Sequence, residues 1–154
     1  MRFPNCSEAL KHLAEGMSVE ACHDFRALRQ IVTCKAWYDQ KKEPFSTETF
    51  QRRMSDAWEA VRVACEKHGG MRPQIGFLSP EVARSLPDEA FAQKVVKVAE
   101  IKRNGLHAGV LAEHSDGTVT VCVDDRCEFA KRGEPVENLK VMLKIYGFDV
   151  EDED

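Results

Sequence analysis

The sequence has little that would place it in a membrane or mark it for export. No apolar run approaches the roughly 18 residues that a membrane span needs. Near the start of the chain, Glu8, Lys11 and Glu15 interrupt the apolar stretch that a secretory signal requires. We therefore expect a cytoplasmic protein with no membrane partner.

Motifs of phosphate and hydrolytic chemistry are also missing. The sequence contains no G-x-x-x-x-G-K-[ST] loop, no G-x-G-x-x-G turn, no G-x-S-x-G motif and no H-E-x-x-H pair. Gly105 and Gly109 fall in a strand-like stretch, which is the wrong context for binding phosphate. We therefore expect a non-enzymatic protein that uses no cofactor.

Closely spaced cysteine pairs are absent as well. The six cysteines stand at positions 6, 22, 34, 65, 122 and 127. Structural zinc sites commonly use tight pairs such as C-x2-C. The weaker candidates are Cys65-x2-His68 and Cys122-x4-Cys127, with His107 and His114. Without a tight pair we expect no metal site. Because we expect the chain to be cytoplasmic, we also expect its cysteines to be reduced thiols that mostly act as small core hydrophobes.

Cys127 is the one candidate nucleophile, because it follows a turn and could lie near His107 or His114. A reactive cysteine needs a base and an electropositive setting. Asp124 and Asp125 precede Cys127 closely and oppose formation of its thiolate. An enzyme built on Cys127 or on the histidines is therefore the least favoured interpretation.

The composition is that of a globular chain, with 43% hydrophobic and 31% charged residues. Its charge is uneven. Residues 1–70 carry 11 Lys and Arg against 10 Asp and Glu, a net charge of +1, whereas residues 71–154 carry 11 against 16, a net charge of −5. The acidic end, 149–154, is expected to be a frayed, solubilising tail that repels nucleic acid phosphates and could attract a basic partner.

The first half is predicted to be helical. The expected helices begin at Ser7, at Ser18 and at Ser46 or Thr47, and they end at Gly16, Tyr38 and Gly70. Apolar residues recur at steps of three and four after Ser18, which predicts one unbroken helix as far as Tyr38. Gly69-Gly70 is interpreted as the cap of the third helix, with a domain hinge as the alternative.

The second half is predicted to be a small antiparallel sheet with a closing helix. A short strand is expected over 74–78, helix starts at Pro80 and Pro87, and a helix that passes into a strand near Val95. The clearest element is a hairpin, in which strands over 106–113 and 118–123 flank an Asp-Gly turn.

The last predicted helix opens at Pro135. Leu139 and Leu143 lie on its apolar face, which Met142 and Ile145 widen. The fold class is therefore α+β, with a helical part over 1–70, a small α+β part over 71–150 and an acidic tail over 151–154.

One segment resembles a DNA-binding motif. Leu13-Ala14-Glu15-Gly16-Met17-Ser18-Val19-Glu20 is similar to the first helix and turn of some helix-turn-helix proteins. The resemblance covers about ten residues. It departs from the pattern, because a recognition helix should follow after one short helix and a turn, whereas here the helix after Gly16 is predicted to run unbroken to Tyr38. It implies DNA binding, for which we expect four arginines of the helical half to be used: Arg26, Arg29, Arg52 and Arg53.

The favoured hypothesis is a small acidic inhibitor or adaptor, similar in character to counter-defence proteins of mobile elements. It would dock on a larger protein or nucleoprotein complex with a basic surface. The expected docking residues are acidic: Asp124, Asp125, Glu128, Asp149, Glu151, Asp152, Glu153 and Asp154. The alternative is a helix-turn-helix-like transcriptional regulator that binds DNA directly.

Overall fold

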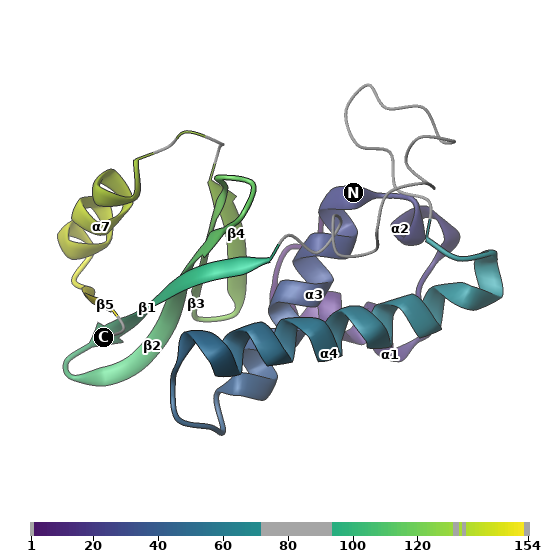
Figure 1. The fold of residues 1–154 in the computed structure, drawn as a ribbon, viewed down its shortest axis with the longest axis horizontal. Coiled ribbons are helices and arrows are strands. Elements are labelled where there is room, and N and C mark those ends of the chain that lie inside the picture. The colour runs from purple at the N-terminus through teal and green to yellow at the C-terminus, as the bar shows by residue number, and fades with distance from the viewer. Residues whose placement is uncertain (1, 72–93, 131–132, 134, 153–154) are drawn as a thin grey trace.

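The computed structural model describes residues 2–71, 94–130, 133 and 135–152 (Figure 1). The helices are α1 (Cys6–Ala14), α2 (Val19–Cys22), α3 (Phe25–Gln40), α4 (Thr47–Cys65), the short 3-10 helix η1 (Glu66–His68) and α7 (Val136–Ile145). The strands are β1 (Val95–Arg103), β2 (Leu106–His114), β3 (Val119–Val123), β4 (Arg126–Ala130) and β5 (Asp149–Asp152). The expected α+β class is confirmed.

Polar side chains cap the N-terminal helices. Asn5 accepts a hydrogen bond from the Glu8 amide at 2.8 Å and begins α1, so the cap lies two residues before the expected Ser7. The prediction of one helix from Ser18 to Tyr38 is wrong. The Asp24 carboxylate accepts from the Ala27 amide at 3.1 Å, which begins α3 and separates it from α2.

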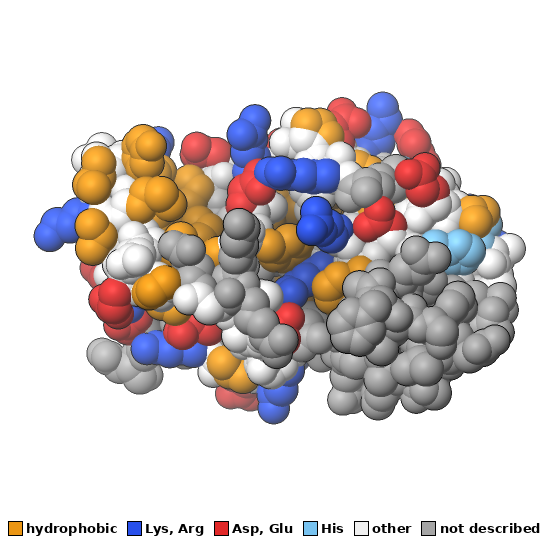
Figure 2. All heavy atoms as spheres, turned by 90° about the horizontal axis from the view of Figure 1, so that it is seen from above, with side chains coloured by type: hydrophobic (Ala, Val, Ile, Leu, Met, Phe, Trp, Pro, Cys, Tyr) orange, Lys and Arg blue, Asp and Glu red, His pale blue; other side chains and the backbone are white. Residues whose placement is uncertain are grey.

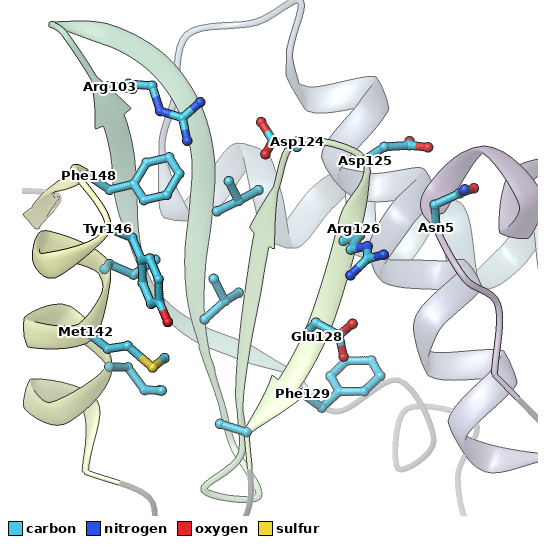
Figure 3. Close-up of a pocket in the computed structure, with 15 residues that line it drawn as sticks. Asn5, Arg103, Asp124, Asp125, Arg126, Glu128, Phe129, Met142, Tyr146 and Phe148 are labelled. Atoms are coloured by element: carbon cyan, nitrogen blue, oxygen red, sulfur yellow. The ribbon is translucent and has the colours of Figure 1, made fainter.

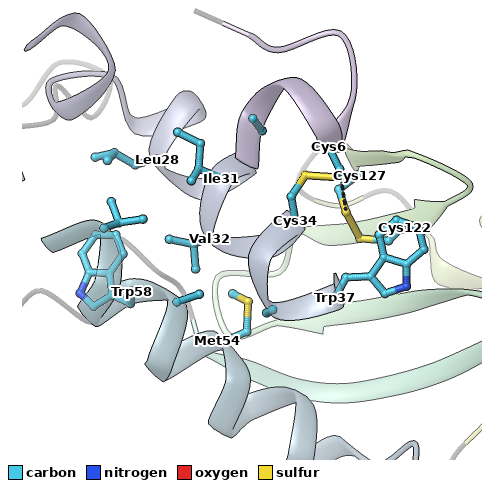
Figure 4. Close-up of a cluster of buried hydrophobic side chains, with 14 of the residues drawn as sticks. Cys6, Leu28, Ile31, Val32, Cys34, Trp37, Met54, Trp58, Cys122 and Cys127 are labelled. Atoms are coloured by element: carbon cyan, nitrogen blue, oxygen red, sulfur yellow. Dashed lines mark hydrogen bonds between the residues drawn. A yellow bond between two sulfur atoms is a disulfide. The ribbon is translucent and has the colours of Figure 1, made fainter. Parts of the chain in front are cut away.

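The helix α3 forms the centre of the N-terminal part. All its residues from Ala27 to Cys34 are buried. Trp37 on α3 and Trp58 on α4 are also buried, with exposed fractions of 1% and 7%, so both belong to the core (Figure 4). Neither tryptophan is therefore a surface anchor for a partner.

The sheet is antiparallel, with the strand order β4-β3-β2-β1-β5. The predicted hairpin is confirmed, because β2 pairs with β3 around the turn that ends at Gly117. The described part of the closing helix also agrees, since Pro135 directly precedes α7. The strand expected near Val95 is present as β1.

The sheet separates two apolar cores. On one face, Val98, Val110 and Cys122 pack with the N-terminal helices. On the other face, Ile101 and Leu111 pack with α7. Figure 1 shows α7 and the N-terminal helices on opposite sides of the sheet. Successive side chains of a strand point to opposite faces of the sheet, so neighbours such as Val110 and Leu111 lie in different cores.

Several expectations fall on residues outside the described ranges. These are the strand over 74–78, the helix starts at Pro80 and Pro87, and the helix before Val95. Gly69 follows η1 in the left-handed conformation, with φ 82°, as a helix-ending glycine does. None of the described helices is both long enough and apolar enough to cross a membrane.

Candidate functional site

A groove of about 810 Å³ opens between α7 and the strands β3 and β4 (Figure 3). Its apolar side chains come from α7, from the residues just after it and from β3 and β4, and most of its polar ones come from the ends of strands and the β3–β4 turn. The lining residues are Asn5, Arg103, Val121, Val123, Asp124, Asp125, Arg126, Glu128, Phe129, Ala130, Leu139, Met142, Leu143, Tyr146 and Phe148. An apolar groove with a few polar groups at its rim is a typical binding site.

Buried side chains of the C-terminal part fix the position of α7. Leu139, Leu143 and Phe148 pack in the same cluster as Ile101 of the sheet. The guanidinium of Arg103 lies 4.3 Å from the centre of the Phe148 ring, which is a cation–π arrangement. These contacts hold one wall of the groove against the sheet.

The outer surface of α7 carries large apolar side chains beside the polar Glu137, Asn138 and Lys144. We call its exposed large apolar residues, with Tyr146 directly after the helix, the α7 patch: Val141 (59% exposed), Met142 (47%), Ile145 (77%) and Tyr146 (71%). They form two rows of residues four apart, so they are neighbours on the helix surface. Figure 2 shows hydrophobic side chains gathered over this end of the molecule.

The structure brings together three of the predicted docking acids. Asp124, Asp125 and Glu128 all line the groove. Glu128 forms an ion pair with Arg2. Asp124 is exposed in the turn between β3 and β4 and has a φ of 57°. The rim of the groove therefore carries carboxylates, as the charge pattern indicated.

Asp125 is a structural residue as well as a rim residue. Its carboxylate accepts hydrogen bonds from the Tyr38 hydroxyl and from the Ser7 amide, and its carbonyl accepts from the Cys6 amide at 2.6 Å. Partial burial alone would raise the pKa of Asp125. The hydrogen bonds from Tyr38 and Ser7, together with the charge of Lys41, bring that pKa below its ordinary value. Asp125 thus fastens the β3–β4 turn to the helices.

The acidic C-terminal residues are part of the sheet. Residues 149–152 form β5, which pairs antiparallel with β1. Lys102 lies 3.0 Å from Glu151, and Lys140 lies 2.9 Å from Asp152. The hydrogen bond from Lys140 lowers the pKa of Asp152. The prediction of a frayed tail is therefore wrong for 149–152, because lysines neutralise two of its carboxylates.

The other three predicted acids are C-terminal, and the structure describes one of them, Asp149. Asp149 is exposed and pairs through its main chain with Lys102 of β1. Glu153 and Asp154 lie outside the described residues. The groove acids and the C-terminal acids thus lie on different edges of the sheet, at β4 and β5.

The arginines of the DNA-binding alternative do not share one face. Arg29 is buried and forms an ion pair with Asp116 at 3.1 Å. Arg53 is paired with Glu43 at 2.6 Å. Arg26 and Arg29 border one hollow on α3, whereas Arg52 and Arg53 lie on α4. The buried run in α3 also leaves little of that helix free to enter a DNA groove.

All six cysteines form disulfides, so the prediction of reduced thiols is wrong for this structure. The pairs are Cys6–Cys34, Cys22–Cys65 and Cys122–Cys127. Cys122 and Cys127 are direct neighbours on β3 and β4. Their pairing removes Cys127 as a nucleophile in this state.

The histidines named with these cysteines contact other groups. Nδ1 of His107 lies 2.7 Å from a Glu100 carboxylate oxygen. Nε2 of His114 lies 2.6 Å from the Thr120 hydroxyl, and Nε2 of His68 lies 2.9 Å from the Met17 carbonyl. The structure therefore does not assemble the cysteine–histidine combinations considered from the sequence.

Sequence reasoning missed the α7 patch as a site. It treated Met142 and Ile145 as extensions of the core face. A signal was present, because the segment 136–146 is apolar over more of its circumference than one packed face requires.

Comparison of the chain with models of protein families, with curated proteins and with solved structures gave no match.

Proposed function

We propose that this chain is a non-enzymatic interaction protein that binds a protein partner through the groove and the adjoining α7 patch. The observation that carries the proposal is the exposure of four large apolar residues on one short helix beside an apolar groove. Contiguous apolar surface rimmed by polar groups is typical of a protein-binding site. Tyr146 and Met142 are also residue types that are enriched at interfaces.

The partner we propose presents an apolar segment flanked by lysine or arginine. Three carboxylates line the groove against two arginines, Arg103 and Arg126. Glu128 is already paired with Arg2, so Asp124 and Asp125 are the acids that a cationic partner would meet. One of those arginines, Arg103, already lies over Phe148. A cationic partner would therefore gain favourable electrostatic steering at the rim, and its binding would weaken with salt.

The wider biological role follows from the same charge argument. We propose a small inhibitor or adaptor that acts on a nucleic-acid-handling assembly with a basic surface in the cytoplasm, where the cysteines would be reduced thiols in place of the three disulfides. Such an assembly offers the cationic segment that the groove requires. Its association would be fast and sensitive to ionic strength.

Site-specific photo-crosslinking in the producing cell tests the proposal. A photoreactive amino acid at Ile145 should give a defined protein adduct, and in a lysate the yield of that adduct should fall when salt is raised before irradiation. The matched control is the same amino acid at Val63 on α4, which is 51% exposed but lies outside the groove.

The nature of the adduct decides between the alternatives. A heterologous protein captured from position 145 and not from position 63 supports the proposal. An adduct to nucleic acid would favour the DNA-binding alternative, and an adduct of two copies of this chain would indicate self-association. Equal adducts at both positions, or none at either, would refute the proposed surface.

A further inference from the structure

Four cysteine sulfurs converge where α1 and α3 meet the sheet (Figure 4). Cys6 and Cys34 form one disulfide, and Cys122 and Cys127 form the next. The Sγ atoms of Cys6 and Cys127 are only 3.6 Å apart. The four cysteines come from α1, α3, β3 and β4, and all are at most 2% exposed.

We propose that these four cysteines, when reduced, form a tetrahedral thiolate site for a zinc ion. The two disulfides and the metal-bound state are then alternative states of one cluster. The Sγ atoms of Cys6, Cys34 and Cys127 all lie within 4.8 Å of one another. The fourth ligand we propose is Cys122, whose sulfur is bonded to Cys127 but lies outside this group of three and must turn toward it.

The spacing of the sulfurs matches the geometry of zinc. A tetrahedral ion with Zn–S bonds of about 2.3 Å holds its ligands about 3.8 Å apart. The Cys6–Cys127 separation is already close to that edge, so the main change is the separation of each bonded sulfur pair. Rotation of the cysteine side chains can provide this without moving a helix or strand.

The local backbone suits such a site. Cys122 and Cys127 flank the β3–β4 turn with a C-x4-C spacing, which falls within the range of structural zinc ligands. Cys6 begins α1, where the helix dipole favours a thiolate. The hydrogen bond from the Cys6 amide to Asp125 holds these two elements together.

The newly made chain carries thiols, and Zn²⁺ binds as they lose up to four protons. From the disulfide state, each S–S bond is cleaved by one molecule of a phosphine reductant. Two thiols form per bond, and the phosphine takes oxygen from water to become the phosphine oxide.

The metal content of the reduced full-length chain provides the first test. Protein made with added Zn²⁺ and purified without oxygen in the phosphine should contain one Zn²⁺ per chain. Cys34→Ser and Cys127→Ser should weaken zinc affinity by more than the about 10–100-fold that loss of an outer-shell partner causes. The matched control replaces Cys22 and Cys65 by serine, and it should retain the zinc.

A second measurement on the unmutated chain covers variants that do not fold. A chelator should increase alkylation of Cys6, Cys34, Cys122 and Cys127, read by mass spectrometry, and leave Cys22 and Cys65 unchanged. Co²⁺ in place of Zn²⁺ should give thiolate charge-transfer absorption. A reduced chain without stoichiometric zinc, or a chelator effect equal at all six cysteines, would overturn the proposal.

Discussion

Arg29 on α3 and Asp116 in the β2–β3 turn form an ion pair that joins the helices to the sheet. A guanidinium nitrogen of Arg29 lies 3.1 Å from an Asp116 carboxylate oxygen, and the Arg29 side chain is only 5% exposed. The same guanidinium also donates to the Thr118 hydroxyl and lies 4.9 Å from the centre of the Phe129 ring. A buried charge with this many contacts depends on its counter-ion.

Removing the charge of Asp116 should destabilise the protein. Asp116→Asn keeps an oxygen that can accept from the Thr118 amide, but it leaves the Arg29 charge without its carboxylate. We expect the free energy of unfolding to fall by about 2 kcal/mol. Asp56→Asn, which disrupts an exposed pair with Arg53, should change it by less than about 0.5 kcal/mol. Urea denaturation measures the free energy of unfolding of both variants. Equal changes in the two would contradict a special dependence of Arg29 on the Asp116 carboxylate.

Acid should destabilise the protein through Asp116 and Asp125. Burial raises the pKa of Asp116, but hydrogen bonds from Thr118 and the charge of Arg29 lower it overall, and the pKa of Asp125 is lowered too. Their stabilisation is therefore fully present above the unfolded pKa of about 3.9 and is lost as pH falls through the folded values. Urea unfolding between neutral and acid pH should show this loss. Over this pH range the Asp116→Asn variant should lose less free energy of unfolding than the unmutated chain. If the free energy of unfolding fell equally steeply with pH in both proteins, Asp116 would not be a source of the loss.

Leu143 and Ile145 on α7 should differ sharply in their effect on stability. Leu143 is buried against the sheet, so Leu143→Ala should lower the free energy of unfolding by about 2–4 kcal/mol. Ile145 is exposed, and Ile145→Ala should change it by less than about 0.5 kcal/mol. Denaturant midpoints of the two variants check this. A large effect at Ile145 would mean that the α7 patch is packed within the chain.

Gly109 is required by a close approach of two strands. A Cβ at this position would lie 1.9 Å from the carbonyl oxygen of Cys122 on the neighbouring strand. Gly109→Ala should therefore destabilise the protein by about 1–3 kcal/mol, as overpacking does. Leu106→Ala at the exposed start of β2 is the control and should be nearly neutral. Thermal unfolding, monitored by circular dichroism, should show a lower Tm for Gly109→Ala and an unchanged Tm for Leu106→Ala. An unchanged Tm for Gly109→Ala would contradict the close approach.

Local patterns predicted the elements that depend on local chemistry. The hairpin could be identified because alternating apolar residues flank Asp116-Gly117, and both signals lie within a few residues. The break before α3 was missed because the apolar spacing continues past it. The side chain of Asp24 ends that continuity by capping α3, and a spacing pattern does not register this competition.

The parts that sequence reasoning missed depend on distant contacts. The acidic run at 149–152 is solvated in isolation but pairs with β1, where Lys102 and Lys140 balance its charge. The partner of Cys6 lies 28 residues away, so spacing alone could not identify it. The groove acids were predicted from charge, whereas the apolar wall beside them required knowledge of which face of α7 packs.

β5 has a consequence for how this molecule avoids aggregation. Between Ala99 and Lys102 it occupies the outer hydrogen-bonding edge of β1, which would otherwise be open to strands from other molecules. β5 itself is four residues long and largely acidic, so it is a poor template for a further strand. A chain shortened after Phe148, which keeps that buried side chain, would expose the β1 edge and should form oligomers through sheet extension.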